Sequence, residues 1–582
     1  MREQSSDALF GRRFARHLGR LVRMYWMSRD GRWAALLLAG AIALELGTVY
    51  GTFLLSDAER RIMDALQANQ STAFLSAIGF FAGVTGGFVL VSAYRIYLRQ
   101  LVEIRWRRGE TADYLDRWMS ERAYCQMHLH GDELDNPDQR IAEDIRDFVG
   151  SALGLSLSLL AAVATLVSFG GLLWRLSGDW ALPLESGYVH VPGVLMWVAL
   201  LYAVVSTWLT HVVGRRLVGL NVDRLRYEAD FRYALMRFRD NVEVVTLSHG
   251  ADLERRGALA RFQNVMRNWW QLIAAQRRLT VFTGVIGQAN AVVPLLIAAP
   301  GFFAGLMTLG AVVQIRFAYG QVSGALNWFV YAYQEIARWR ANVERLSTFT
   351  EVIDATAADL ERSRIQVVPG ETPTLRLTNL RLEAPTGATL IDTVNASVAA
   401  GERVAITGPS GTGKTVLLRA IAGIWPFGTG RIDVPARARM LFVPQRPYLP
   451  LGSLRVAVSY PAPEGTFTDD RIRDVLEALG LGRLTTRLDE TEPSWAQQLS
   501  PNEQQRLGIA RVLLNVPDWV FLDKATSALD DDMEKRVYAL LAERLPRATV
   551  ISIVHRPEVA AYHTRRWTIA PTDHGTASLQ AA

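Results

Sequence analysis

The chain has 582 residues, of which 50% are hydrophobic and 21% charged, and its formal net charge is +6. A single hydrophobic core stops growing at about 250–300 residues, so this length predicts at least two domains. The average composition hides very apolar stretches that alternate with ordinary polar sequence, which excludes a uniformly soluble protein. We assign the positive charge to membrane topology and expect no nucleic-acid partner.

Long uncharged stretches occur at residues 33–55, 73–94, 148–174, 187–213 and 279–315. Each can cross about 30 Å of hydrocarbon, which takes about 20 helical residues. The last stretch contains Pro294 and Pro300, so we divide it into two spans joined by a tight turn near Pro300. The sequence therefore predicts six transmembrane helices, and the sixth continues through residues 317–333.

Arginine is concentrated in the loops that we place on one side of the membrane. The proposed inner segments, 1–32, 95–147 and 214–278, hold 30 arginines, whereas the proposed outer loops hold three. Lys and Arg are retained in cytoplasmic loops, so both termini are predicted to be cytoplasmic, in a chain inserted without cleavage. Cys125 is the only cysteine, which rules out an internal disulfide and fits a structural thiol.

The polar segments between the second and third spans and between the fourth and fifth have helical periodicity. In residues 227–250 apolar side chains recur at steps of three and four, the stripe of an amphipathic helix. These segments predict helical extensions below the membrane that dock on a cytoplasmic domain. Purely solubilising structure is the alternative.

A phosphate-binding loop is predicted at residues 408–415, GPSGTGKT, which follow an apolar strand and precede a helical segment. The glycines let backbone N–H groups converge on phosphate oxygens, the lysine reaches the terminal phosphates, and the threonine offers a hydroxyl to Mg²⁺. The residues expected to bind ATP here are Gly408, Ser410, Gly411, Gly413, Lys414 and Thr415.

A second motif, WVFLD at residues 519–523, has four apolar residues and then a carboxylate. This pattern is typical of a buried strand that delivers Asp523 to the magnesium shell. VPQRP, with Gln445, lies between the two phosphate motifs. LSPNEQQR precedes the strand, and TSALD and SIVHR follow it.

This ordered set of motifs resembles the nucleotide-binding domain of ATP-binding-cassette (ABC) proteins over residues 375–569. The resemblance implies that two such domains enclose two ATP molecules, each held between the phosphate loop of one subunit and the signature segment of the other. It implies that Gln445, with Thr415 and Asp523, surrounds Mg²⁺, and that His555 is the switch histidine at the terminal phosphate. The contacts that it implies to the partner subunit's ATP come from Ser500, Asn502 and Asp530.

The expected fold class is an α-helical six-span transmembrane domain followed by an α/β P-loop nucleotide-binding domain. Short strands separated by turns in residues 374–407, and their later alternation with helices, favour the α/β assignment. We expect the membrane domain at residues 1–350, a linker at 351–365 and the nucleotide-binding domain at 366–582.

The sequence departs from the pattern of the ABC family in three ways. Pro501 and Asn502 replace glycines of the signature, so closure of the dimer is expected to be altered. Ala384 lies near where many relatives stack a tyrosine on adenine, which predicts loose base selectivity. Lys524 occupies the position of the catalytic glutamate, and an ammonium cannot accept the proton of the attacking water. A naturally slow site and a chain altered to trap ATP both remain open.

The membrane half resembles the SbmA and BacA peptide importers, their bacterial fusions to an ATPase, and the peroxisomal acyl-CoA transporters. The resemblance covers about residues 90–350, and NPDQRI, at the start of NPDQRIAED (136–144), is its most specific string. It implies a homodimer in the bacterial inner membrane that imports peptides, peptide-like antibiotics or cobalamin. A fatty-acid or acyl-CoA transporter is the second hypothesis, and an ATP-gated protein without a transport cycle is the third.

Polar side chains in the sixth predicted span favour a water-filled cavity and a polar cargo. The alternative is interhelical hydrogen bonding. We also expect Glu45 and Arg316 to lie at similar membrane depth on the cavity side, where each charge needs a partner or water. The remaining candidates for the cavity wall are Gln314, Tyr319, Gln321 and Asn327.

Overall fold

The computed structural model describes residues 12–120, 123–129, 136–177, 179–184, 187–361, 364–492, 494–554, 556–572 and 576–581. The chain divides into two compact units. The first consists of the described residues up to Tyr114, together with Asn136–Thr348. The second consists of the described residues of Leu115–Asp135 and Phe349–Ala582.

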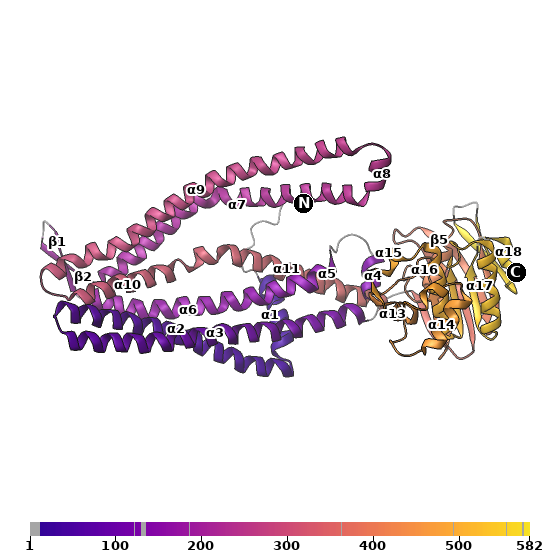
Figure 1. Cartoon of the computed structure of the whole chain (residues 1–582), viewed down its shortest axis with the longest axis horizontal. Helices are drawn as coiled ribbons and strands as arrows, with labels where there is room; N and C mark the ends of the chain where they lie inside the picture. The colour runs from indigo at the N-terminus through magenta and orange to yellow at the C-terminus, as the bar shows by residue number, and fades with distance from the viewer. Residues whose placement is uncertain are drawn as a thin grey trace. The chain divides into compact units, whose positions relative to one another are not determined.

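The first unit is built from long helices, most of which run along its length (Figure 1). A hairpin of β1 (Asp179–Leu184) and β2 (Gly187–Pro192) joins α6 to α7, and a π-helical turn, Arg140–Asp144, joins α5 to α6. The helices are α1 (Arg12–Trp26), α2 (Arg29–Gln67), α3 (Ser71–Met119), α5 (Pro137–Gln139), α6 (Ile145–Ser177), α7 (Val194–Asp240), α8 (Val242–Leu247), α9 (Ala251–Phe303), α10 (Leu309–Leu326) and α11 (Trp328–Glu361).

Five helical runs in the described residues are long and apolar enough to cross a membrane. They are α2, α3, the run from α5 through α6, α7 and α9. The sixth predicted span corresponds to α10, which has 18 residues and is followed directly by α11. A sixth span therefore remains a prediction.

Two predicted span ends differ from the structure. The fourth apolar stretch begins at residue 187, but Gly187–Pro192 form β2 and the helix begins only at Val194. Gly193 has φ 70°, a left-handed conformation that breaks the helix and suits glycine. The fifth span was predicted to end near Pro300, whereas α9 continues to Phe303 and contains that proline.

The C-terminal end of α2 is tied to the start of α10. The backbone N–H of Gly310 donates to Asp64 Oδ1 at 3.1 Å, and that of Leu309 donates to Gln67 Oε1 at 2.7 Å. A Cβ atom at Gly310 would lie 2.3 Å from the carbonyl oxygen of Arg60. Glycine therefore permits this close approach of the two helices.

A buried aromatic contact sets the relative level of α2, α6 and α10. Phe169 on α6 is fully buried, and its ring centroid lies 5.8 Å from that of Phe53 and 5.9 Å from that of Phe317. Phe53 and Phe317 consequently lie at one height in the helix bundle.

The second unit is built around a ten-stranded sheet with strand order β3-β7-β4-β5-β14-β13-β6-β12-β11-β8. The strands are β3 (Ile365–Gly370), β4 (Thr374–Glu383), β5 (Thr389–Ala399), β6 (Arg403–Thr407), β7 (Gly428–Pro435), β8 (Met440–Val443), β11 (Trp519–Asp523), β12 (Thr549–Ile553), β13 (Arg565–Pro571) and β14 (Ala577–Ala581), with β9 (Gly452–Ser453) and β10 (Thr491–Glu492) in a separate pair. The helices are α4 (Ala123–Leu129), α12 (Lys414–Ile421), α13 (Leu454–Ser459), α14 (Asp469–Ala478), α15 (Trp495–Gln498), α16 (Pro501–Asn515), α17 (Asp531–Arg544) and α18 (Pro557–Ala560).

The strand β11 reads as a continuous apolar run because each of its faces is buried in a hydrophobic core. It pairs in parallel with β12 and β8, and its first four residues are buried. The Phe521 ring stacks on Phe442 at 4.2 Å between centroids. The carboxyl ends of β6, β12 and β11 lie along one edge of the sheet, where Asp523 follows the last buried residue.

The strands expected within residues 374–407 are confirmed as β4, β5 and β6. Residues 351–365, where a linker was expected, comprise the end of α11, Arg364 and the first residue of β3, and 362 and 363 lie outside the described part.

Candidate functional site

The predicted phosphate loop connects β6 to α12. Gly408 has φ 140°, and a Cβ atom there would lie 2.2 Å from the carbonyl oxygen of Ile569. Gly413, with φ 88°, is the N-cap residue of α12 and packs closely on Ile391. Only glycine fits both positions, so the loop brings its backbone N–H groups, including that of exposed Ser410, to a helix N-terminus.

Lys414 lies under the loop and is buried. Its Nζ donates to the carbonyl oxygens of Gly408, at 2.8 Å, and Pro409. Burial lowers the pKa of Lys414, and the nearby positive charge of Lys524 lowers it further, while Asp523 opposes the shift. An anionic phosphate in the loop would offer this ammonium a stronger partner than neutral carbonyl groups do.

The hydroxyl of Thr415 donates to Asp523 Oδ1 at 2.9 Å. A hydroxyl and a carboxylate that meet at the edge of the sheet form the hard oxygen set that Mg²⁺ prefers, so these residues fit the ion that ATP normally carries. Gln445 is exposed in the loop after β8, and its Nε2 donates to Ser527 Oγ at 3.3 Å. An Mg²⁺ ion held by Thr415 and Asp523 would neutralise negative charge on the phosphates of ATP.

Lys524 directly follows Asp523 and has φ 54°, a left-handed conformation. Its carbonyl oxygen accepts hydrogen bonds from the backbone N–H of Ser527 and from Gln505 Nε2, at 3.4 Å. Among the described residues no carboxylate forms an ion pair with its ammonium group. The structure therefore holds the backbone of this turn firmly, and the side chain has no acidic partner within the described part of the chain.

Gln505 connects the segments around the site and was not singled out from the sequence. It is buried on α16, and its Nε2 donates to the carbonyl oxygen of Gln445 at 2.9 Å and to Ser527 Oγ at 3.1 Å. Its Oε1 accepts the backbone N–H of Ala528 at 2.8 Å. The only sequence signal is an amide at an inward position of a largely apolar helix.

Ser500 forms a capping box with Glu503 at the start of α16. Ser500 Oγ accepts the N–H of Glu503, and Glu503 Oε2 accepts the N–H of Ser500 at 3.0 Å. Burial opposes ionisation of Glu503, but the Ser500 N–H and the Arg483 guanidinium together hold its pKa below the ordinary value. The capping box fixes Ser500 at the exposed N-terminus of α16, which is suited to an anion.

Two other predicted contacts to a partner's ATP lie close to this helix end. Asn502 Nδ2 donates to the carbonyl oxygen of Ala528 at 3.3 Å. Asp530 caps α17 by accepting the N–H of Met533 at 2.8 Å. The signature segment and the segment after β11 are thus neighbours within one chain.

His555 lies outside the described residues, so its predicted contact with the terminal phosphate stays a prediction. The next residue, Arg556, forms ion pairs with Glu534 and Asp531, each at 2.8 Å. Glu534 also accepts from Thr526 Oγ1 at 2.6 Å. The segment after β12 is therefore fastened to α17.

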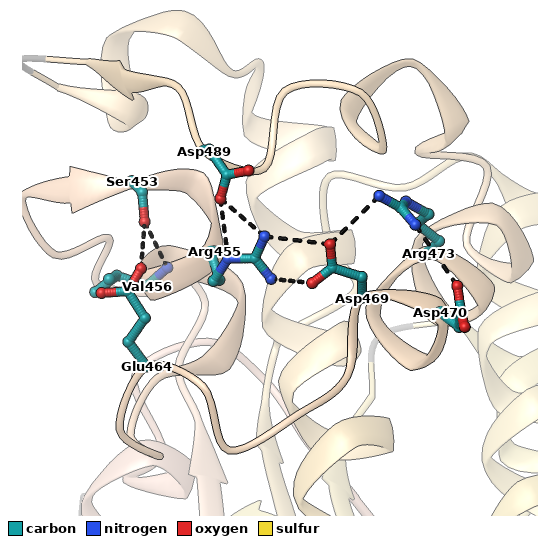
Figure 2. A network of polar contacts seen from close by, with 8 residues as sticks. All are labelled: Ser453, Arg455, Val456, Glu464, Asp469, Asp470, Arg473 and Asp489. Carbon is teal, nitrogen blue, oxygen red and sulfur yellow. Dashed lines mark hydrogen bonds and ion pairs between the residues drawn. The ribbon is translucent and has the colours of Figure 1, made fainter.

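A charged network holds the segment between Gln445 and the signature in place (Figure 2). Arg455 lies between two carboxylates, donating to Asp489 Oδ1 at 2.8 Å and to both oxygens of Asp469. Arg473 reaches the same Asp469 at 3.4 Å. The hydrogen bond from Arg455 lowers the pKa of Asp469, so both ions stay charged at neutral pH.

In the membrane unit, Glu45 is paired with Arg95 and not with Arg316. Arg95 donates to both carboxylate oxygens of Glu45, at 2.8 and 3.0 Å, and Glu45 is 5% exposed. Arg316 is exposed and lies beside Phe317, at the height of Phe53. Glu45 lies eight residues before Phe53 on α2, which is about 12 Å along the helix at 1.5 Å per residue. The prediction that Glu45 and Arg316 share one depth is therefore wrong, because the aromatic contact places Arg316 at the level of Phe53, whereas Glu45 lies nearer the N-terminal end of α2, where it pairs with Arg95.

The polar side chains of the sixth predicted span differ in their surroundings. Gln314 and Tyr319 are buried within the unit, and Gln321 is half-buried. The Tyr319 hydroxyl has no hydrogen-bond partner among the described residues. Asn327 Oδ1 accepts from Thr207 Oγ1 on α7 at 2.9 Å, which is an interhelical hydrogen bond.

A polar cavity of about 730 Å³ opens among α3, α6 and α11 of the membrane unit. Charged groups of both signs and two small polar side chains line it. They are Arg99, Glu103, Arg146, Asp147, Ser151, Glu335, Arg338, Asn342 and Arg345. Arg345 also donates to Asp144 at 2.7 Å, so one wall is held by an ion pair.

Known families match both parts of the chain. Residues 21–303 match "ABC transporter transmembrane region 2", and residues 391–527 match "ABC transporter". The chain is 35% identical over 567 residues to an uncharacterised ABC transporter ATP-binding protein of Synechocystis sp., covering 93% of this chain and 83% of that protein. It is 30% identical to the inner membrane ABC transporter ATP-binding protein YddA of Escherichia coli, covering 93% and 94%. It is 26% identical to the lysosomal cobalamin transporter ABCD4 of Mus musculus, covering 80% of each.

A solved bacterial Atm1-family ABC exporter with ATP bound has the same fold. The TM-score is 0.69 at 18% identity, and the match covers 93% of this chain and 94% of the other. A membrane region is thus fused to an ATP-binding domain, which implies a transport-coupled ATPase that binds ATP, typically with Mg²⁺. The chain belongs to the ABC transporter family.

Proposed function

We propose that the protein is a homodimeric, ATP-driven transporter of the bacterial inner membrane that imports a hydrophilic cargo such as a peptide, a peptide-like antibiotic or cobalamin. The observation that carries this proposal is the polar cavity, which presents four arginines and three carboxylates. A peptide offers partners of both signs to such a lining. A hydrocarbon chain offers none and would leave the charges desolvated.

The acyl-CoA hypothesis remains the second candidate for the cargo. A coenzyme A headgroup would suit the arginines of the cavity, but it carries no positive charge to pair with Glu103, Asp147 and Glu335. Cobalamin is the substrate in the name of a 26% identical relative, which supports a large polar cargo. An ATP-gated protein that moves no cargo is the third candidate.

Proteoliposomes separate these candidates. ATP added outside reaches only those molecules whose nucleotide-binding domain faces outward. Import toward the nucleotide-binding side then appears as ATP-dependent release of a cargo loaded inside, and export appears as accumulation. With the Lys524→Glu variant, which has a carboxylate at the general-base position, we expect release of a labelled oligopeptide and retention of a labelled acyl-CoA. Release of acyl-CoA alone would replace the peptide proposal, and movement of neither cargo would favour the ATP-gated protein.

The contribution of the cavity is tested by changing its charge. Arg99→Gln and Arg338→Gln, both in the cavity lining, are expected to reduce peptide release without changing ATP binding. Arg256→Gln, an exposed arginine on α9 outside the cavity, is the matched control. Equal release by the cavity variants and the control would remove the cavity from the transport path.

We propose that each ATP is shared between two subunits, with Ser500, Asn502 and Asp530 contacting the partner's nucleotide. The exposed N-terminus of α16, capped by Ser500, supports this because it is oriented to receive an anion from outside the chain. In a chain with Cys125→Ala, Ser410→Cys and Ser500→Cys should crosslink between subunits when ATP is present. A monomer with normal, cooperative hydrolysis would refute the shared site.

The proposed topology puts both termini and the far ends of α7 and α9 in the cytoplasm. The short helix α8 joins these two helices and exposes Val244 and Leu247. An exposed apolar turn at the end of a long helical hairpin supports the expected docking on a cytoplasmic domain. The proposed candidates for the wall of the transport path remain Glu45, Arg316, Gln314, Tyr319, Gln321 and Asn327.

A further inference from the structure

The N-terminal helix α1 is strongly basic. Its 15 residues, RRFARHLGRLVRMYW, include five arginines and no acidic residue. Such a helix either packs against acidic partners or faces a negatively charged environment. Its two faces therefore have to be considered separately.

One face of α1 packs against the membrane unit. Leu21 and Tyr25 are buried, and the Tyr25 ring stacks on Trp106 of α3 at 6.2 Å between centroids. Trp26 meets the same Trp106 edge-on at 5.4 Å, and Phe14 meets Trp339 of α11 at 5.7 Å. These aromatic contacts fix how α1 is rotated about its axis.

The opposite face carries Arg16, Arg20 and Arg23, which are all exposed. Steps of four and three residues bring side chains to the same side of a helix, so the three guanidinium groups project together. Ala15 and Gly19, which flank these arginines on α1, are also exposed and small.

The height of α1 follows from the pairing of α2 with α3. Arg95 on α3 donates to Glu45 on α2. Trp106, which α1 contacts, lies 11 residues after Arg95 on α3. Trp33, where the first apolar stretch begins, lies 12 residues from Glu45 along α2. Both distances are about 17 Å at 1.5 Å per residue, so α1 lies at the level of Trp33. It also runs across the long helices and not along them (Figure 1).

We propose that the arginine face of α1 binds the headgroups of anionic phospholipids in the inner leaflet. A basic helix that lies across the bundle, at the level where the first hydrophobic span begins, meets the headgroup layer. Each arginine near an anionic surface strengthens binding about fivefold. The proposal rests on the cytoplasmic placement of the N-terminus and is independent of the cargo.

Energy transfer from a single labelled position to labelled lipids tests the proposal. Cys125 is the only cysteine, so Cys125→Ala combined with Ala15→Cys puts a donor fluorophore beside the arginine face of the full-length protein. The protein is reconstituted in phosphatidylcholine that contains a trace of acceptor-labelled phosphatidylglycerol or of phosphatidylcholine with the same acceptor. We expect phosphatidylglycerol to be enriched near residue 15, and the enrichment to fall about fivefold for each of Arg16, Arg20 and Arg23 changed to Gln.

The control removes the same charge at exposed positions at the far ends of α7 and α9. It should leave the enrichment unchanged, and it consists of Arg232→Gln, Arg237→Gln and Arg256→Gln. Changing the three arginines of α1 to Lys should preserve it. If the Gln variants do not fold, rising ionic strength must still abolish enrichment in the parent. Equal transfer to the two lipids in the parent, unchanged enrichment after the Gln changes, or competition by millimolar inorganic phosphate would each overturn the proposal.

Discussion

Lys524→Glu is expected to raise the rate of ATP hydrolysis by about a hundredfold to ten-thousandfold, the contribution of a positioned general base. This range equals about 3–5 kcal/mol of transition-state stabilisation, at 1.36 kcal/mol for each factor of ten. The turn at Lys524 is held through its carbonyl oxygen by Gln505 and Ser527, so its position does not depend on the ammonium group. Its φ of 54° strains lysine and glutamate alike. The substitution therefore changes the chemistry at a fixed position.

Lys524→Gln separates the loss of a positive charge from the gain of a base. Both substitutions remove the charge that helps to lower the pKa of Lys414, but only glutamate can take a proton from water. We expect the Gln variant to hydrolyse ATP as slowly as the parent. Both variants should retain binding of Mg-ATP through Lys414 and the loop amides.

Phosphate release by the full-length protein in lipid nanodiscs, at saturating Mg-ATP, measures these rates. Binding of a fluorescent ATP analogue to the same samples shows whether a slow variant still holds nucleotide. Equal rates for the parent and the Glu variant would refute the assignment of Lys524 to the general-base position. A Gln variant as fast as the Glu variant would show that charge removal, and not base catalysis, accounts for the gain.

Phe521→Ala should lower the free energy of unfolding of the second unit by about 3–5 kcal/mol, because it empties a buried stacked position. The exposed control Tyr448→Ala should lower it by less than about 0.5 kcal/mol. Denaturant unfolding measures both values. Gly408→Ala should abolish binding of the ATP analogue, because the new Cβ would lie 2.2 Å from a carbonyl oxygen. Gly482→Ala is the control and should bind normally, because its new Cβ would meet no atom closer than 3.9 Å. The pKa of Glu503 is lower in the folded chain than the unfolded value of 4.5, so its stabilisation is complete above about pH 4.5 and is lost as the pH falls through the folded pKa. Thermal unfolding followed below pH 5 should show a steeper loss for the parent than for Glu503→Gln, and parallel curves would contradict this.

The phosphate site was largely predictable because its chemistry depends on residues close in sequence. Strand, glycine loop and helix follow one another, so Gly408, Lys414 and Thr415 could be assigned from their order alone. Asp523 could be assigned from four apolar residues that end in a carboxylate only together with the motifs that precede and follow them. The structure then brings Thr415 and Asp523 within 2.9 Å.

The contacts that could not be predicted join residues far apart in the chain. The Glu45–Arg95 pair depends on the register of a hairpin between two long helices, which hydrophobic composition does not specify. Gln505 bonds two separate segments, the loop with Gln445 and the turn from Lys524 to Ser527, through one amide, and a single amide in a helix carries no recognisable pattern. Residues 187–192 are apolar enough for a membrane helix, yet they pair as a strand, because composition alone does not distinguish the two.

The bonds between α2 and α10 have a mechanical consequence for a transport cycle. Separating these helices at Gly310 would break two hydrogen bonds, one of them to the Asp64 carboxylate, at a cost of about 2–4 kcal/mol. A cycle that avoids this cost moves α2 and α10 as a single lever. The break in the helix at Asn327, between α10 and α11, then lies at the opposite end of that lever, where a hinge would let α11 turn while the pinned end stays closed.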